Sequence, residues 1–234
     1  MLPLSDHNPS STTSVVNYIL IAANVLMFFW ELSLGAGIER RLFLVSFVPA
    51  RFWVAPFYPI NLIRILISMF LHAGWLHLGG NMLYLWIFGD NVEDRLGHFK
   101  YLIFYVLCGG IATIAHAAMN PASRIPSIGA SGAIAGVLGA YILLFPKAQV
   151  TTLIPIFVFI TVREIPAIVV LGLWFVLQLF VGVASIGVAD ANAGGVAVFA
   201  HIGGFIAGML LVVVMGGYRR TPRAPISYDD YFRR

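Results

Sequence analysis

Gly129-Ala130-Ser131-Gly132-Ala133 opens a short apolar run that continues to Phe145 and stops at Pro146. The 15 residues from Ser131 to Phe145 make about 22 Å of α-helix at ~1.5 Å per residue. The hydrocarbon core of a bilayer is roughly 30 Å thick, so this helix is too short to cross a membrane alone. One of its ends must lie inside the membrane. If that end is Ser131, a hydroxyl is recessed below the lipid surface.

The composition is that of a polytopic membrane protein. Of the 234 residues, 60% are hydrophobic and 10% are charged, and the mean hydropathy is +0.91, whereas soluble domains are about 45–50% apolar and about 25% charged. The basic residues are not clustered with aromatic residues as they would be on a nucleic-acid-binding face, so the net charge of +4 indicates no nucleic-acid partner. The single cysteine, Cys108, excludes an internal disulfide and a multi-cysteine metal site.

The pattern of apolar runs predicts an all-α fold with six spans, and the fourth is the short one. The expected spans are residues 15–34, 65–89, 99–117, 131–145, 167–186 and 195–217. We expect a flexible polar N-terminus over 1–14, one six-span domain over 15–217 and a basic cytoplasmic tail over 218–234. The connector 147–166 contains an apolar part, 153–160, that is too short to span.

Two regions carry polar groups that the spans must accommodate. Asn17, Asn24 and Glu31 are spaced by seven in the first span, so they share one helix face. We expect that face to point into the bundle. Residues 35–63 mix prolines and charges with aromatic residues, which excludes a simple span. Aromatic rings and arginines together predict a folded loop in the membrane interface.

Six spans place both termini on the same side of the membrane. With the termini in the cytoplasm, nine of the 14 basic residues lie inside, as the positive-inside rule favours. The fourth and sixth spans then enter from the same side. His201 lies six residues after Gly195, roughly 9 Å into its helix. Ser131 and His201 therefore fall at similar depth.

Serine becomes a good nucleophile when a histidine removes its proton. Small residues repeat every four positions on both helices, so the backbones can approach closely; these residues are Gly132, Gly136 and Ala140 on one, and Ala200, Gly204 and Gly208 on the other. None of the ten acidic residues lies within two turns of His201 on its helix, so we predict a Ser–His dyad without an acid. The start of the Ser131 helix offers free N–H groups to an oxyanion. His77 and Asn81 share a face of the second span and add side-chain donors.

Together these motifs resemble those of the rhomboid intramembrane serine proteases. The motifs are Gly-Ala-Ser-Gly-Ala at 129–133, His-x-x-x-x-His-x-x-x-Asn at 72–81, Glu-x-x-x-Gly at 93–97 and Ala-His-x-x-Gly-x-x-x-Gly at 200–208. The resemblance implies that Ser131 is the nucleophile and His201 the general base, and that His77, Asn81 and the Ser131 amide form an oxyanion hole. It implies structural roles for His72, Arg64, Glu93, Gly97, Gly129, Gly132, Gly204 and Gly208.

The chain departs from the pattern of some family members at two positions. Ile63 stands where some have a tryptophan before the loop arginine, and Ala135 stands where some have an aromatic residue that packs on the histidine. The dyad itself is intact, so we expect activity to be retained. The second departure leaves open how His201 is oriented.

The resemblance implies an enzyme that cuts transmembrane segments of other membrane proteins, in particular single-span ones. We expect no cofactor and no metal, membrane lipid as a partner, and a place in the bacterial plasma (inner) membrane. One alternative is a metal-binding membrane protein that uses His72, His77, His116 and His201. Another is a non-catalytic binding protein on the same scaffold. A transporter is disfavoured because no inverted repeat or charged pathway is present.

Overall fold

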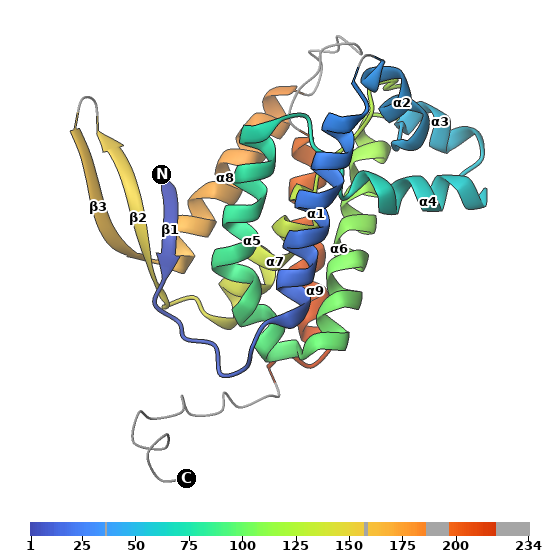
Figure 1. Cartoon of the computed structure of the whole chain (residues 1–234). Coiled ribbons are helices and arrows are strands. Elements are labelled where there is room, and N and C mark those ends of the chain that lie inside the picture. Colours follow the sequence, from blue (N-terminus) through green and yellow to red (C-terminus); the bar gives the residue numbers. More distant parts are fainter. Residues whose placement is uncertain (36, 157–158, 186–196, 219–234) are drawn as a thin grey trace.

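The computed structural model describes residues 1–35, 37–156, 159–185 and 197–218. Within these ranges a bundle of helices dominates (Figure 1). It consists of α1 (Val15–Ser33), α5 (Trp75–Leu96), α6 (His98–Met119), α7 (Ser131–Leu144), α8 (Ala167–Ser185) and α9 (Val198–Val214). Among the described helices, α1, α6 and α8 are long and apolar enough to cross a membrane, while α7 and α9 are shorter apolar helices.

Helix α7 is the centre of the bundle. Every residue from Gly132 to Tyr141 is buried, and α7 packs against α5, α6 and α9. The outer helices instead turn large apolar side chains outward, including Leu26, Ile111 and Phe180. This pattern is inverted relative to a soluble protein and fits a bundle surrounded by lipid. The short helix identified from the sequence is therefore shielded from lipid by its neighbours.

The second expected span is wrong in its limits. The second span was expected within residues 65–89, but α4 (Pro59–Ser68) ends before a turn and α5 begins only at Trp75. Hydropathy does not separate α4 from α5, because the run Ile65–Leu71 between them is apolar. In the structure, the His72 backbone N–H in this turn donates to the Glu31 carboxylate (3.0 Å) instead of to a helix carbonyl. Helix α5 also continues past residue 89, the expected end of the span, to Leu96.

The all-α expectation is wrong at the N-terminus and in the connector between α7 and α8. Residues 2–6 form β1 (Leu2–Asp6), which pairs antiparallel with β2 (Gln149–Ile156), and β2 pairs antiparallel with β3 (Phe159–Pro166). The sheet lies beside the bundle, next to α8 and α5 (Figure 1). The alternating β-branched residues Val150, Thr152 and Ile154 favour a strand. Hydropathy along the connector did not reveal them.

The expected flexible N-terminus also differs from the structure. Beyond strand β1, the Ser10 hydroxyl donates to Asp90 (2.6 Å), and the Ser11 and Thr12 hydroxyls donate to Asp94 (2.9 and 2.6 Å). Polar residues without a hydrophobic pattern indicated a free tail. They instead satisfy the carboxylates at the end of α5, which is why that helix extends past its apolar part.

Between α1 and α5, the described residues form the short helices α2 (Ile38–Val45), α3 (Pro49–Val54) and α4. Pro49 and Pro59 each stand at a helix start, where the missing N–H costs nothing. Phe57 and Val54 are among the most exposed side chains, at 91% and 85%. The interfacial position of this loop stays a prediction.

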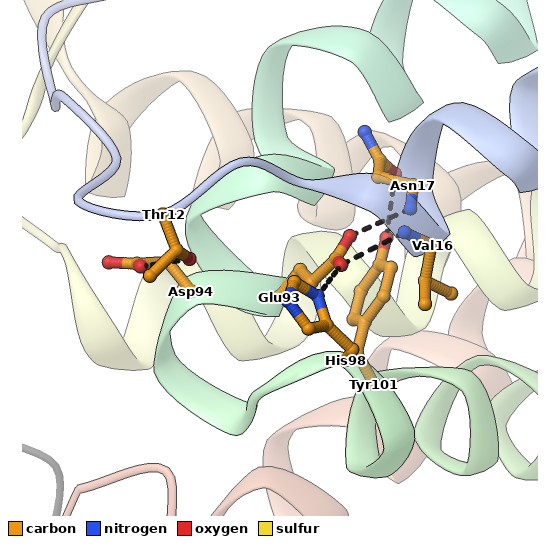
Figure 2. A network of polar contacts seen from close by, with 7 residues as sticks. All are labelled: Thr12, Val16, Asn17, Glu93, Asp94, His98 and Tyr101. Atoms are coloured by element: carbon orange, nitrogen blue, oxygen red, sulfur yellow. Dashed lines mark hydrogen bonds and ion pairs between the residues drawn. The ribbon is translucent and has the colours of Figure 1, made fainter.

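A buried carboxylate fixes the end of the bundle where α1 begins (Figure 2). Glu93 on α5 is fully buried and accepts hydrogen bonds from the backbone N–H groups of Val16 (3.0 Å) and Asn17 (2.7 Å). Its Oε1 lies 2.5 Å from His98 Nδ1. The carboxylate thus satisfies free donors at a helix N-terminus, where the helix dipole also favours negative charge.

The polar face of α1 points into the bundle, as its spacing predicts. Asn17, Asn24 and Glu31 are all buried. Asn17 donates to the Leu85 carbonyl (3.0 Å) and accepts from the Tyr101 hydroxyl (2.9 Å), so it ties α1 to both α5 and α6.

Candidate active site

Ser131 occupies the first position of α7, and its approach requires glycine. Gly129 has φ +126°, a conformation that side chains disfavour, and a Cβ there would lie 2.8 Å from the His77 ring. The Gly129 N–H donates to the Ser68 carbonyl (2.8 Å), and the Ser127 N–H donates to the Phe47 carbonyl (2.8 Å). The loop before Ser131 is therefore held by the end of α4 and by the segment between α2 and α3.

Helices α7 and α9 touch backbone to backbone along the predicted small-residue faces. A Cβ on Gly204 would lie 2.0 Å from the Gly132 carbonyl oxygen, and a Cβ on Gly208 would lie 1.9 Å from that of Gly136. No larger residue fits at either glycine without separating the helices. This contact brings Ser131 and His201 to the same level of the bundle.

The Ser131 and His201 side chains are hydrogen-bonded, with Ser131 Oγ 2.8 Å from His201 Nε2. This lies within the range expected for a serine and its general base. His201 is buried, with 8% of its surface exposed. The pair predicted from two separate motifs therefore meets in space across the α7–α9 contact.

The other side of the His201 ring contacts α8, which sequence reasoning missed. His201 Nδ1 lies 3.0 Å from Gln178 Oε1, and the Trp174 and His201 ring centroids are 5.8 Å apart. Trp174 thus supplies an aromatic neighbour for the histidine, although Ala135 leaves α7 without one. A signal was available, because Gln178 interrupts an otherwise apolar helix and follows Trp174 by one turn.

His77 lies next to the nucleophile, whereas Asn81 serves another histidine. The ideal Cβ position of Gly129 is 2.8 Å from His77 Nε2 and 3.7 Å from Ser131 Oγ, so Gly129 separates the two side chains. Asn81 Nδ2 lies 3.0 Å from His72 Nε2, and His72 Nδ1 lies 3.2 Å from the Phe70 carbonyl. An amide nitrogen only donates, so His72 carries its proton on Nδ1.

A small cavity adjoins the serine. It has a volume of about 20 Å³ and is bordered by residues of α4, α6, α7 and α9, among them Ser68, Thr113 and Ser131. This is enough for about one water molecule, and the hydroxyl groups in its wall are suitable partners.

The remaining predicted residues lie outside this centre. Arg64 on α4 donates to the Leu44 carbonyl (3.2 Å) and to Asn61 Oδ1 (3.1 Å), which ties α4 to the end of α2. Gly97 joins α5 to α6 with φ +80°, and its N–H donates to the Glu93 carbonyl (2.6 Å). Residues 219–234 of the expected basic tail lie outside the described residues.

The histidines of the metal-binding alternative do not form a metal site in the part of the chain that the structure describes. No group of three or more His, Cys, Asp or Glu residues there is arranged to hold an ion. The geometry around His201 instead consists of a hydroxyl, an amide and an indole ring, which are not a set of metal ligands.

The rhomboid domain model matches residues 59–218, most of the chain. The chain belongs to the rhomboid family. The rhomboid protease GluP of Bacillus subtilis is 31% identical over 85% of this chain and 34% of its own length. The mitochondrial rhomboid protein 1 of Saccharomyces cerevisiae is 32% identical over 65% of this chain and 42% of its own length. The chloroplastic rhomboid-like protein 11 of Arabidopsis thaliana is 27% identical over 69% and 54%.

This rhomboid chain thus spans about a third to a half of the length of those relatives. Family membership and the apolar helices make it an integral membrane protein. The relatives come from bacterial, mitochondrial and plant sources, so they do not identify one membrane. The matched region contains the Ser131–His201 pair, Gln178 and Glu93.

Proposed function

We propose that this protein is an intramembrane serine endopeptidase that cleaves transmembrane segments of other membrane proteins. The observation that supports this most strongly is the 2.8 Å contact between Ser131 Oγ and His201 Nε2 at the start of a buried helix in a rhomboid bundle. His201 would accept the Ser131 proton as the oxygen attacks the peptide carbonyl. It would then give that proton to the leaving amine.

The negative charge on the carbonyl oxygen needs donors close to Ser131. The Ser131 backbone N–H is one of the free donors at the start of α7, where the helix dipole also favours an anion. His77 lies beside it and is our candidate for a side-chain donor. One N–H of the Asn81 amide donates to His72, and the second N–H is the one that would donate to the oxyanion. Water for the second half of the reaction has room in the cavity beside Ser131.

The substrate class follows from the recessed position of the site. We infer that α1, α5, α6, α7, α8 and α9 are six spans, and that the site opens on the side where α7 and α9 begin. A substrate then approaches through lipid, and a single-span segment is the simplest one to admit. The basic residues favour cytoplasmic termini, and we assign the protein to a bacterial inner membrane.

The test is a cleavage assay in proteoliposomes with a model single-span substrate. We expect wild type to cut it, and both Ser131→Ala and His201→Ala to lose at least about 1,000-fold in rate. Ser185→Ala, at the far end of α8, is the matched control and keeps wild-type activity. Full cleavage by Ser131→Ala would refute the proposal. Loss of cleavage with a chelator while Ser131→Ala stays active would instead support the metal-binding alternative.

A further inference from the structure

Gln178 is a polar residue within an otherwise apolar helix. Helix α8 reads AIVVLGLWFVLQLFVGVAS, and Gln178 is its one polar residue before the final serine. A polar amide inside an apolar span is costly unless it has a partner. Leu177 and Leu179 on either side are exposed at 53% and 39%, while Gln178 is half-buried and turned toward the bundle. Its partner there is His201.

We infer that Gln178 is a positioning residue that holds the His201 imidazole in the form able to act as a base. This rests on the proposed function, because it assigns a role within the same reaction. An amide oxygen only accepts hydrogen bonds, so the 3.0 Å contact with Gln178 Oε1 requires the His201 proton on Nδ1. The lone pair of Nε2 then faces Ser131 Oγ.

The arrangement places three groups in one hydrogen-bonded line. The Ser131 hydroxyl donates to His201 Nε2 (2.8 Å), and His201 Nδ1 donates to Gln178 Oε1 (3.0 Å). In Ser-His-Asp and Cys-His-Asn enzymes the third group fixes the ring and its tautomer in the same way. A neutral amide suits a membrane interior, where an unpaired carboxylate is expensive. The absence of an acid near His201 in sequence therefore does not leave the base without an orienting partner.

The Trp174 ring supports the same assignment from a second direction. It lies one turn before Gln178 on the same face of α8, and its centroid is 5.8 Å from that of His201. Trp174 also packs against Phe205 on α9, at 6.1 Å between centroids. The ring of His201 is thus restrained by a flat aromatic neighbour and its tautomer by the amide. Both contacts come from α8.

The variant Gln178→Leu tests the role. Leucine is well tolerated in a membrane-spanning helix, so we expect normal expression and an unchanged unfolding temperature. Loss of the acceptor lets His201 populate the unproductive tautomer. We expect kcat for the model substrate to fall about tenfold with little change in KM. The rate of labelling by a fluorophosphonate falls by the same factor, because this reaction reports on Ser131 alone.

Two further variants separate positioning from packing. Gln178→Glu keeps an oxygen acceptor of the same length and is expected to restore most of the labelling rate. Leu177→Val alters the neighbouring, outward-facing side chain and is expected to behave as wild type. Unchanged kcat and labelling in Gln178→Leu, with wild-type activity that still requires Ser131, would overturn the inference while leaving the proposed function intact. Activity that does not require Ser131 would instead refute the proposed function.

Discussion

Two buried polar clusters, one near each end of α5, are built in different ways. The Glu93 cluster contains a fully buried carboxylate that accepts hydrogen bonds from three donors (Figure 2). The Ser131–His201 pair lies next to His77. On α5, His77 precedes Glu93 by 16 residues, which is about 24 Å along the helix axis. It uses neutral groups and borders a cavity. The Glu93 cluster joins α1 to α5 and so stabilises the fold. In the second cluster, the Ser131 proton can transfer to His201 Nε2.

The largest expected effect is that of His201→Ala, which should lower activity far more than stability. Removal of the base should lower the cleavage rate by about 1,000-fold or more. The thermal unfolding temperature in detergent should fall only slightly, because the two groups that lose their partner, the Ser131 hydroxyl and the half-buried Gln178 amide, are neutral. A substantial fall in unfolding temperature would show that the pair also holds the bundle together, and the contrast with Glu93 would fail.

Glu93→Ala is expected to do the reverse. It leaves the N–H groups of Val16 and Asn17 without acceptors in a buried position, so the free energy of unfolding should fall by about 3 kcal/mol. Denaturant titration of the detergent-solubilised protein measures this. Asp94→Ala is the matched control. Among the described residues, Asp94 accepts hydrogen bonds from Ser11 and Thr12, and its substitution should cost about 1 kcal/mol. Equal effects of the two substitutions would contradict the account.

Gly208→Ala should lower both stability and activity. Its Cβ would lie 1.9 Å from the Gly136 carbonyl oxygen, so α7 and α9 must separate, at a cost of about 2 kcal/mol. The same separation lengthens the Ser131–His201 contact and lowers activity. Gly172→Ala on α8 has no atom within 4 Å of its Cβ and is the control. Wild-type activity and stability in Gly208→Ala would show that the close approach is not required.

The smallest effect concerns the pH dependence of stability. Burial raises the pKa of the Asp6 carboxyl from 3.8 to about 6, while the Tyr141 hydroxyl, which donates to it, acts in the opposite direction. The folded protein therefore binds the proton more tightly, and this contribution to stability is lost as pH rises from about 4 to about 6. The amplitude should be about 1 kcal/mol, because the side chain is partly exposed.

Asp6→Asn removes the proton-linked part and keeps an oxygen for Tyr141. Its unfolding temperature should change less with pH than that of wild type between about pH 4 and about pH 6.5. The same slope in both proteins would show that another group titrates in this range. The experiment also tests whether β1 stays docked on the bundle.

Several parts of the architecture were accessible from the sequence because they depend on local spacing. The short helix follows from its length between Gly129 and Pro146, and the α7–α9 contact follows from glycines repeated every four residues. The seven-residue spacing of Asn17, Asn24 and Glu31 identified a face that points inward. Each of these features is set by the period of a helix, which a single sequence displays directly.

The missed features depend on contacts between distant segments. The sheet requires β1 to pair with β2, which lies more than 140 residues away in the sequence. The hydropathy pattern of neither segment predicts this pairing. The limits of α5 depend on donors from the N-terminal segment. Gln178 and Trp174 lie more than 20 residues before His201, so the search for a third group along the His201 helix did not reach them.

The central claim is that His201 activates Ser131. The most direct measurement is labelling of the detergent-solubilised protein with a fluorophosphonate, followed by mass spectrometry to locate the adduct. The account predicts one adduct, on Ser131, that is absent in Ser131→Ala and strongly reduced in His201→Ala. An adduct on another residue, or equal labelling of wild type and His201→Ala, would contradict it.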